Sequence, residues 1–124
     1  MLDIRLLGGF AVQVDGTDVP DDAWRLRKAR SLVKLLALAP GHRIHREQAY
    51  GLLWPGKEDA RALNNSLHQA MYAARRALDT ANAGGAGILA LRDDLLSLNG
   101  DVTVDAVELE AAIAAARAEP SLAT

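Results

Sequence analysis

The chain has 124 residues and no cysteine, and half of its residues are apolar. This length corresponds to one domain with a hydrophobic core, and the lack of cysteine excludes disulfides, iron-sulfur clusters and thiol nucleophiles. No apolar run approaches the roughly 20 residues that cross a bilayer, and the first residues do not have the order of a signal peptide. We therefore expect a cytoplasmic protein without a membrane partner.

The net charge of −2 hides an uneven distribution of charge along the chain. Between Arg25 and Arg76 there are eleven Lys and Arg residues against three acids, about +8, and the remaining residues carry about −10. A basic segment of this kind predicts an anionic partner such as nucleic acid.

The first 20 residues have the pattern of short strands. Apolar residues alternate over Leu2–Leu6 and again over Phe10–Val14, with Gly8 and Gly9 between the two runs. Asp15-Gly16 is typical of a hairpin turn and predicts a third short strand near Val19. Pro20-Asp21-Asp22 then interrupts the pattern.

Helical spacing begins at Arg27 and predicts a first helix of about 13 residues that ends at Pro40-Gly41. Ile44 is expected to be a single residue of bridging strand. A short second helix should run from Arg46 to Trp54. His45 is a poorer cap for that helix than Ser or Thr would be. Trp54 is expected to pack between the second and third helices.

The third helix is expected from Glu58 or Ala60 to Leu78, with acids near its positive N-terminal end. The glycine-rich segment 83–87 predicts a flexible loop, and the runs Ile88–Leu91 and Leu95–Leu98 predict a hairpin. An amphipathic helix should follow from Asp105 to Ala118, with Val107, Leu109 and Ile113 as its main apolar residues.

A helical wheel of the third helix separates two kinds of residue. At about 100° per residue, the apolar residues fall on one side, and the other side carries Arg61, Asn65, His68, Gln69, Tyr72, Arg75 and Arg76. Asn and Gln pair with adenine and Arg with guanine, and Arg also binds phosphate. An ordinary solvated helix face would mix Glu with Lys, so an acid-free face favours contact with DNA.

This order of elements predicts an α+β fold, a winged helix-turn-helix with an N-terminal antiparallel sheet, three helices and a C-terminal hairpin wing. We expect residues 1–100 to form this DNA-binding domain and residues 101–124 to begin a second domain. Asn65, His68, Gln69 and Tyr72 are then candidates for reading bases. The candidates for phosphate contacts are Arg43, Arg46, Arg61, Arg75 and Arg76, with Arg92 at the hairpin tip.

Other functional signals are weak. The segment 51–57 has the spacing of a phosphate loop, but Glu58 stands where Ser or Thr would hold magnesium and the first glycine lies in a predicted helix. The three histidines have no carboxylates at metal-ligand spacing. No catalytic set is apparent, so we expect no enzyme activity, no cofactor and no metal.

The chain resembles a known family in three segments: LLGGFAVQVDG, the block RLRKARSLVKLLALAPGHRIHREQAYGLLWPG, and the helix NNSLHQAMYAARRAL. This combination is similar to the N-terminal domain of the Streptomyces antibiotic regulatory proteins, which is itself similar to the DNA-binding domains of OmpR and PhoB. The resemblance covers about residues 2 to 100. VDAVELEAAIAAARA resembles the start of the bacterial transcriptional activation domain that follows in that family.

The resemblance implies an activator that binds tandem direct repeats in double-stranded promoter DNA and contacts RNA polymerase. A second copy would then bind the neighbouring repeat. Ala73-Ala74 departs from the Arg-Leu pair frequent in the family. This departure, with the acidic pair Asp93-Asp94, leaves an alternative open: a winged helix kept for protein interaction or autoregulation, with weak affinity for DNA.

Overall fold

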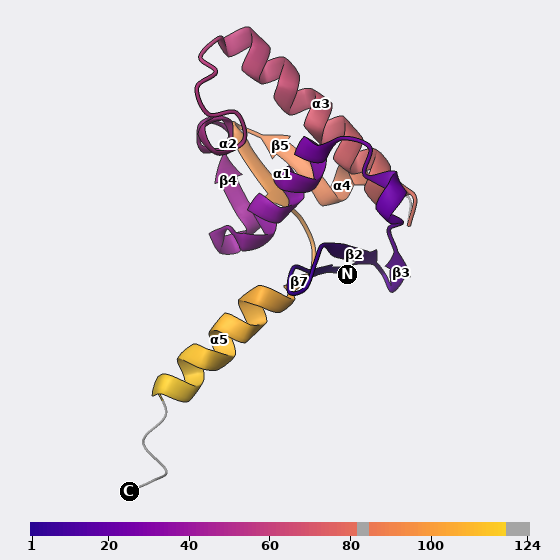
Figure 1. Cartoon of the computed structure of the whole chain (residues 1–124), viewed down its shortest axis with the longest axis vertical. Coiled ribbons are helices and arrows are strands. Elements are labelled where there is room, and N and C mark those ends of the chain that lie inside the picture. The colour runs from indigo at the N-terminus through magenta and orange to yellow at the C-terminus, as the bar shows by residue number, and fades with distance from the viewer. Residues whose placement is uncertain (82–84, 119–124) are drawn as a thin grey trace, which may run out of the picture.

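The computed structural model describes residues 1–81 and 85–118, and it has an α+β fold with two small sheets beside packed helices (Figure 1). The strands are β1 (Leu2–Arg5), β2 (Ala11–Val14), β3 (Thr17–Asp18), β4 (Arg43–His45), β5 (Leu89–Arg92), β6 (Leu95–Leu98) and β7 (Val102–Val104). The helices are α1 (Arg27–Leu38), α2 (Arg46–Leu53), α3 (Ala60–Asp79), α4 (Gly85–Ile88) and α5 (Asp105–Ala118), with single 3₁₀ turns at Asp21–Ala23 and Pro40–His42. The predicted α+β class is confirmed.

The N-terminal sheet follows the alternation in the sequence. β1 pairs antiparallel with β2, and their buried residues lie opposite one another, Ile4 beside Val12. Asp15 and Gly16 both have positive φ, 49° and 83°, and connect β2 to β3 as a two-residue hairpin turn. The predicted hairpin is confirmed, although its second strand ends at Asp18, just before Val19.

β7 adds a fourth strand to this sheet. Val102 lies beside Leu2, and Val104 lies beside Ile4, in parallel pairing with β1. The sheet has the order β3-β2-β1-β7. It is therefore a mixed sheet rather than a purely antiparallel one, and it extends past residue 100, where the sequence predicts the first domain to end.

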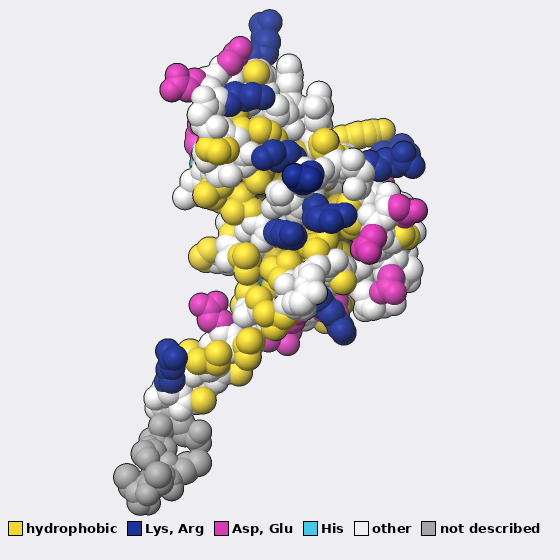
Figure 2. Space-filling model, viewed as in Figure 1, with side chains coloured by type: hydrophobic (Ala, Val, Ile, Leu, Met, Phe, Trp, Pro, Cys, Tyr) yellow, Lys and Arg dark blue, Asp and Glu magenta, His cyan; other side chains and the backbone are white. Residues whose placement is uncertain are grey.

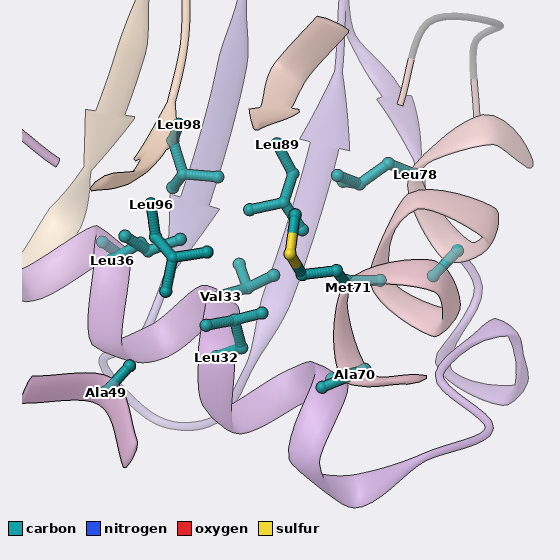
Figure 3. Packing of buried hydrophobic residues seen from close by; sticks show 14 of the residues in the cluster. Leu32, Val33, Leu36, Ala49, Ala70, Met71, Leu78, Leu89, Leu96 and Leu98 are labelled. Carbon is teal, nitrogen blue, oxygen red and sulfur yellow. The ribbon is translucent and has the colours of Figure 1, made fainter. Parts of the chain in front are cut away.

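The core includes the buried faces of α1, α3, the N-terminal sheet and the second sheet, which has the order β4-β6-β5. Figure 3 shows side chains from α1, α3 and the second sheet pointing toward one another. The fully buried members include Leu32, Val33 and Leu36 of α1, Leu67, Met71 and Leu78 of α3, Leu89 of β5 and Leu96 of β6. Removal of this apolar surface from water holds α3 against the rest of the fold.

α2 is fixed at both ends by side chains. His45 Nδ1 accepts a hydrogen bond from the Glu47 amide at 3.1 Å, and Gln48 Oε1 accepts one from the His45 amide at 3.3 Å. His45 therefore forms a reciprocal cap with Gln48, a stronger start than the sequence predicts. At the other end Lys28 Nζ of α1 donates to the Leu53 carbonyl. Trp54 is half-buried and packs against the core, and its ring lies 6.0 Å from Lys28 Nζ of α1.

The predicted hairpin after α3 is confirmed as β5 and β6. Asp93 and Asp94, with φ of 52° and 64°, form the turn between them. Of the segment expected to be a flexible loop, 83–84 lie outside the described residues, while α4 occupies Gly85–Ile88. The loop prediction is wrong for this second part, and Ile88 ends α4 instead of beginning a strand.

α5 projects away from the rest of the molecule (Figure 1). None of its residues is buried, and Val107, Leu109 and Ile113 are exposed. The predicted helix is confirmed, but Val107, Leu109 and Ile113 do not contribute to the core described above, and Ala106 in its first turn packs against that core. Its attachment is at its first residue, because the Asp105 carboxylate accepts hydrogen bonds from the amides of Leu6 (2.7 Å) and Leu7 (3.2 Å).

Candidate nucleic-acid interface

α3 has the two sides that its sequence predicts. Asp59 caps its first turn by accepting from the amides of Arg61 (3.0 Å) and Ala62 (3.4 Å). Its buried side consists of Leu63, Leu67, Ala70, Met71, Ala74, Ala77 and Leu78. The exposed side carries Arg61, Asn65, His68, Gln69, Tyr72 and Arg76. The helix thus presents six of its seven candidate residues to solvent and contains no acid before Asp79.

The central residues of this side have polar groups available to a ligand. Within residues 1–81 and 85–118, no intramolecular hydrogen bond occupies the side chains of Asn65, His68 or Gln69. Tyr72 is 54% exposed. Arg76 lies beside it, with Nη1 donating to the Tyr72 hydroxyl at 3.3 Å and its guanidinium 5.7 Å from the ring centroid. The result is a row of amide, imidazole, phenol and guanidinium groups along one helix.

Arg75 lies apart from this row. It is half-buried, and its Nε donates to the Leu89 carbonyl of β5 at 2.9 Å. The wheel predicts an exposed arginine because it describes the helix alone, and the hairpin that covers this side of α3 comes later in the chain. Arg75 therefore ties α3 to the β5–β6 hairpin, and its Nε is already occupied within the fold.

Arg46 is likewise occupied by intramolecular contacts. Its Nε and Nη2 donate to the Tyr50 hydroxyl at 3.0 and 2.8 Å, its Nη2 also donates to Asn64 Oδ1 of α3, and its Nη1 donates to Asp94 Oδ1 at 3.3 Å. The bond to Tyr50 raises the pKa of Arg46 above its ordinary value, against the opposing effect of burial. Arg46, predicted as a phosphate contact, is thus a charged bridge between α2, α3 and the hairpin turn, with its donors used by these partners.

Arg43 and Arg92 lie together on the second sheet. Both are exposed, and both line a shallow hollow of about 490 Å³ on this sheet. In the strand register Arg43 lies opposite Ser97, and Arg92 lies opposite Leu95, so the two arginines share one face of the sheet. Asp93 lines the same hollow and offsets part of their positive charge.

Two cations near α3 were not among the predicted contacts. Lys57 lies in the connection before α3, and its Nζ donates to Ser66 Oγ at 3.4 Å. Arg25 precedes α1 and lines a groove beside the exposed side of α3. The position of Lys57 just before a helix N-terminus was a usable signal in the sequence, whereas the placement of Arg25 depends on the tertiary fold.

Basic side chains gather over α1 in the view of Figure 2, and most acidic side chains lie at the margins of that face. Lys34 and Arg30 of α1 lie 5.3 and 5.7 Å from the centroid of the Phe10 ring. These two cations therefore pack partly on an aromatic ring. The positive charge of the middle of the chain is thus spread over several surfaces, among them the exposed side of α3, the surface of α1 and, through Arg43, the second sheet.

The part of the chain that the structure describes contains no group of three His, Asp or Glu side chains placed to hold a metal ion. Its helices are all too short or too polar to cross a bilayer.

Comparison of the chain with protein-family models, curated proteins and solved structures finds no significant match.

Proposed function

We propose that the chain is a sequence-specific DNA-binding module of a bacterial transcription regulator, built as a winged helix-turn-helix. In this proposal α2 and α3 are the helix-turn-helix, α3 is the recognition helix, and the β5–β6 hairpin is the wing. The resemblance of three sequence segments to the Streptomyces antibiotic regulatory proteins motivates the same assignment. RNA polymerase and a second copy on a neighbouring repeat are the further partners proposed on that basis.

The observation that carries this proposal is the exposed side of α3. A helix of 20 residues presents amides, an imidazole, a phenol and arginines to solvent, and its first acid is Asp79 at its last residue. The major groove of DNA admits a helix of this width, and these are the side chains that form hydrogen bonds to base edges and phosphates there. The opposite side of α3 is buried in the core, which fixes these side chains relative to the rest of the fold and supports the proposal.

The roles proposed for individual residues follow from their positions. Asn65, His68, Gln69 and Tyr72 occupy the middle of the exposed side and would contact bases. Arg61 and Arg76 flank them toward the two ends of α3 and would contact phosphates, as would Arg43 and Arg92 on the sheet. Arg46 and Arg75 are proposed to position the helix and the wing, because all three guanidinium nitrogens of Arg46 and the Nε of Arg75 donate to partners within the fold.

A titration of labelled duplex DNA tests these roles. The duplex is one that the chain itself enriches from a random library, and an unrelated duplex of equal length serves as competitor. Replacing Gln69 or Asn65 by Ala should reduce the preference for the enriched duplex by about 1–3 kcal/mol for each base that the variant no longer reads. Replacing Arg76 by Ala should weaken binding to both duplexes and lower the salt dependence by about one unit of slope.

Arg117→Ala on the distant helix α5 is the matched control for Arg76→Ala, since it removes the same charge far from α3. A wild-type chain that binds both duplexes equally weakly would overturn the DNA-reading proposal. That result would favour the second candidate, an interaction module, for which the acidic residues Asp93 and Asp94 at the exposed hairpin tip are the supporting observation.

A further inference from the structure

A groove runs along the exposed side of α3, on the side away from the hairpin. Its volume is about 960 Å³, and it is open to solvent. One wall is the segment 20–25, which connects β3 to α1. The other wall is the second half of α3, including Gln69, Tyr72, Ala73 and Arg76.

The wall formed by segment 20–25 is firmly held. Its 3₁₀ turn is closed by hydrogen bonds from the Ala23 amide to the Pro20 carbonyl (3.0 Å) and from the Trp24 amide to the Asp21 carbonyl (3.3 Å). Trp24 is buried and packs edge-on against Phe10, with ring centroids 5.1 Å apart. Because Trp24 is anchored in this way, the backbone that carries Arg25 is held in place beside the groove.

The lining of the groove combines apolar and cationic surface. Ala73, Ala23 and Pro20 supply apolar surface, and Arg25 and Arg76 supply positive charge from the two walls. Among the described residues that line the groove, Asp22 is the one acid. A sugar-phosphate strand has the matching composition, because apolar deoxyribose faces alternate with phosphates along it.

We infer that this groove receives one sugar-phosphate strand of the duplex that α3 reads, with Arg25 and Arg76 contacting its phosphates from opposite sides. The inference rests on the proposed function. A helix in the major groove has a phosphate strand on each side of it. The hairpin lies on one side of α3, held by Arg75, so one strand passes the hairpin and the other passes the groove.

Removing a positive and a negative charge from the groove should change the affinity for DNA in opposite directions. Arg25→Ala should weaken binding several-fold for every duplex and lower the salt slope by about one, without changing sequence preference. Asp22→Asn should strengthen binding and leave preference unchanged, because a carboxylate beside a phosphate is repulsive. The same changes of charge on α5, Arg117→Ala and Glu110→Gln, are the matched controls.

The titrations use the full chain with the enriched duplex and the unrelated duplex, at about 50 and 200 mM salt. Circular dichroism of each variant shows that it remains folded. If the wild type prefers the enriched duplex, but Arg25→Ala and Asp22→Asn behave as their α5 controls do, the groove does not receive the strand and the proposed function stands. If the wild type shows no preference, the proposed function itself fails, and the groove inference fails with it.

Discussion

Arg46 connects three elements through one guanidinium. It donates to Tyr50 of its own helix, to Asn64 of α3 and to Asp94 in the hairpin turn, and its backbone amide donates to the Asp94 carbonyl at 2.9 Å. The Arg46 side chain is 20% exposed, while that of Asp94 is 61% exposed. The partly buried bonds to Tyr50 and Asn64 should therefore contribute more to stability than the solvated ion pair.

Arg46→Ala should lower the free energy of unfolding by about 1–3 kcal/mol, since it leaves polar groups of Tyr50 and Asn64 without a partner. Asp94→Asn should cost less than about 1 kcal/mol, because it removes only the exposed ion pair and Asn tolerates the positive φ of this position. Urea unfolding of both variants measures the difference. Equal losses would show that the ion pair dominates the bridge.

Asp105 joins the start of α5 to the end of β1. Hydrogen bonds from the amides of Leu6, Leu7 and Ala106 hold the pKa of its carboxyl below its ordinary value, the bond from Leu6 having the largest effect. A carboxyl whose pKa is lowered by folding stabilises the fold fully above its unfolded pKa. This stabilisation is lost as the pH falls through the lower pKa of the folded state.

Asp105→Asn should therefore lower the free energy of unfolding at neutral pH. The difference in this free energy between the variant and the wild type should shrink as the pH falls. Urea unfolding of both chains between about pH 7 and pH 2 measures this convergence. Asp101→Asn, at an exposed position before β7, is the control for removal of a carboxylate. A difference that stays constant across this range would mean that the charge of Asp105 does not matter.

At the scale of elements, the two-residue turns are strong local determinants. Gly16 has φ of +83° in the turn between β2 and β3, whereas Gly51 lies inside α2, and open space surrounds the position of an added Cβ at both. Crowding therefore plays no part in either substitution. Only the backbone conformation distinguishes the two glycines.

Gly16→Ala should lower the free energy of unfolding by about 1–2 kcal/mol, because a Cβ is unfavourable at positive φ. Gly51→Ala should raise it by about 0.5–1 kcal/mol, because alanine loses less entropy than glycine in a helix. Thermal or urea unfolding of the two variants gives the comparison. Two changes of the same sign would contradict the assigned backbone conformations.

Elements with local signals were predictable, and those that depend on distant contacts were not. Alternation and Asp-Gly indicated the first hairpin, and helical spacing indicated α1 and α3. β7 is three residues long and pairs in parallel with β1 from the opposite end of the sequence, so no local pattern marks it. α4 has the sequence GAGI, which does not favour a helix by itself.

The residues of the candidate site also fall into those that the sequence predicts correctly and those whose placement depends on distant contacts. The exposed side of α3 follows from periodicity alone, and six of its seven predicted residues lie there. Arg75 differs because its partner, Leu89, comes from the hairpin that follows α3 in the chain. Arg46 differs because its partners come from three elements: Tyr50 of its own helix, Asn64 of α3 and Asp94 of the hairpin turn. The place of Arg25 beside α3 likewise depends on how segment 20–25 is anchored by Trp24.

For the whole molecule, α5 stands apart from the core. It has no buried residue, and a helix of 14 residues is marginal in water without tertiary packing. Beyond its first turn, its backbone amides should exchange with deuterium roughly 100-fold faster or more than those near Met71 in α3. Exchange followed by NMR measures both helices in one sample. Equal protection would show that α5 packs against another surface in solution, for which Val107, Leu109 and Ile113 are the exposed apolar residues.

The proposal that the exposed side of α3 reads DNA is tested most directly by mapping the contact surface. Backbone and side-chain NMR signals are followed while the enriched duplex is added to the labelled full chain. The largest shifts should fall on Asn65, His68, Gln69, Tyr72 and Arg76. Small shifts there, or shifts confined to α1 or α5, would contradict the proposal.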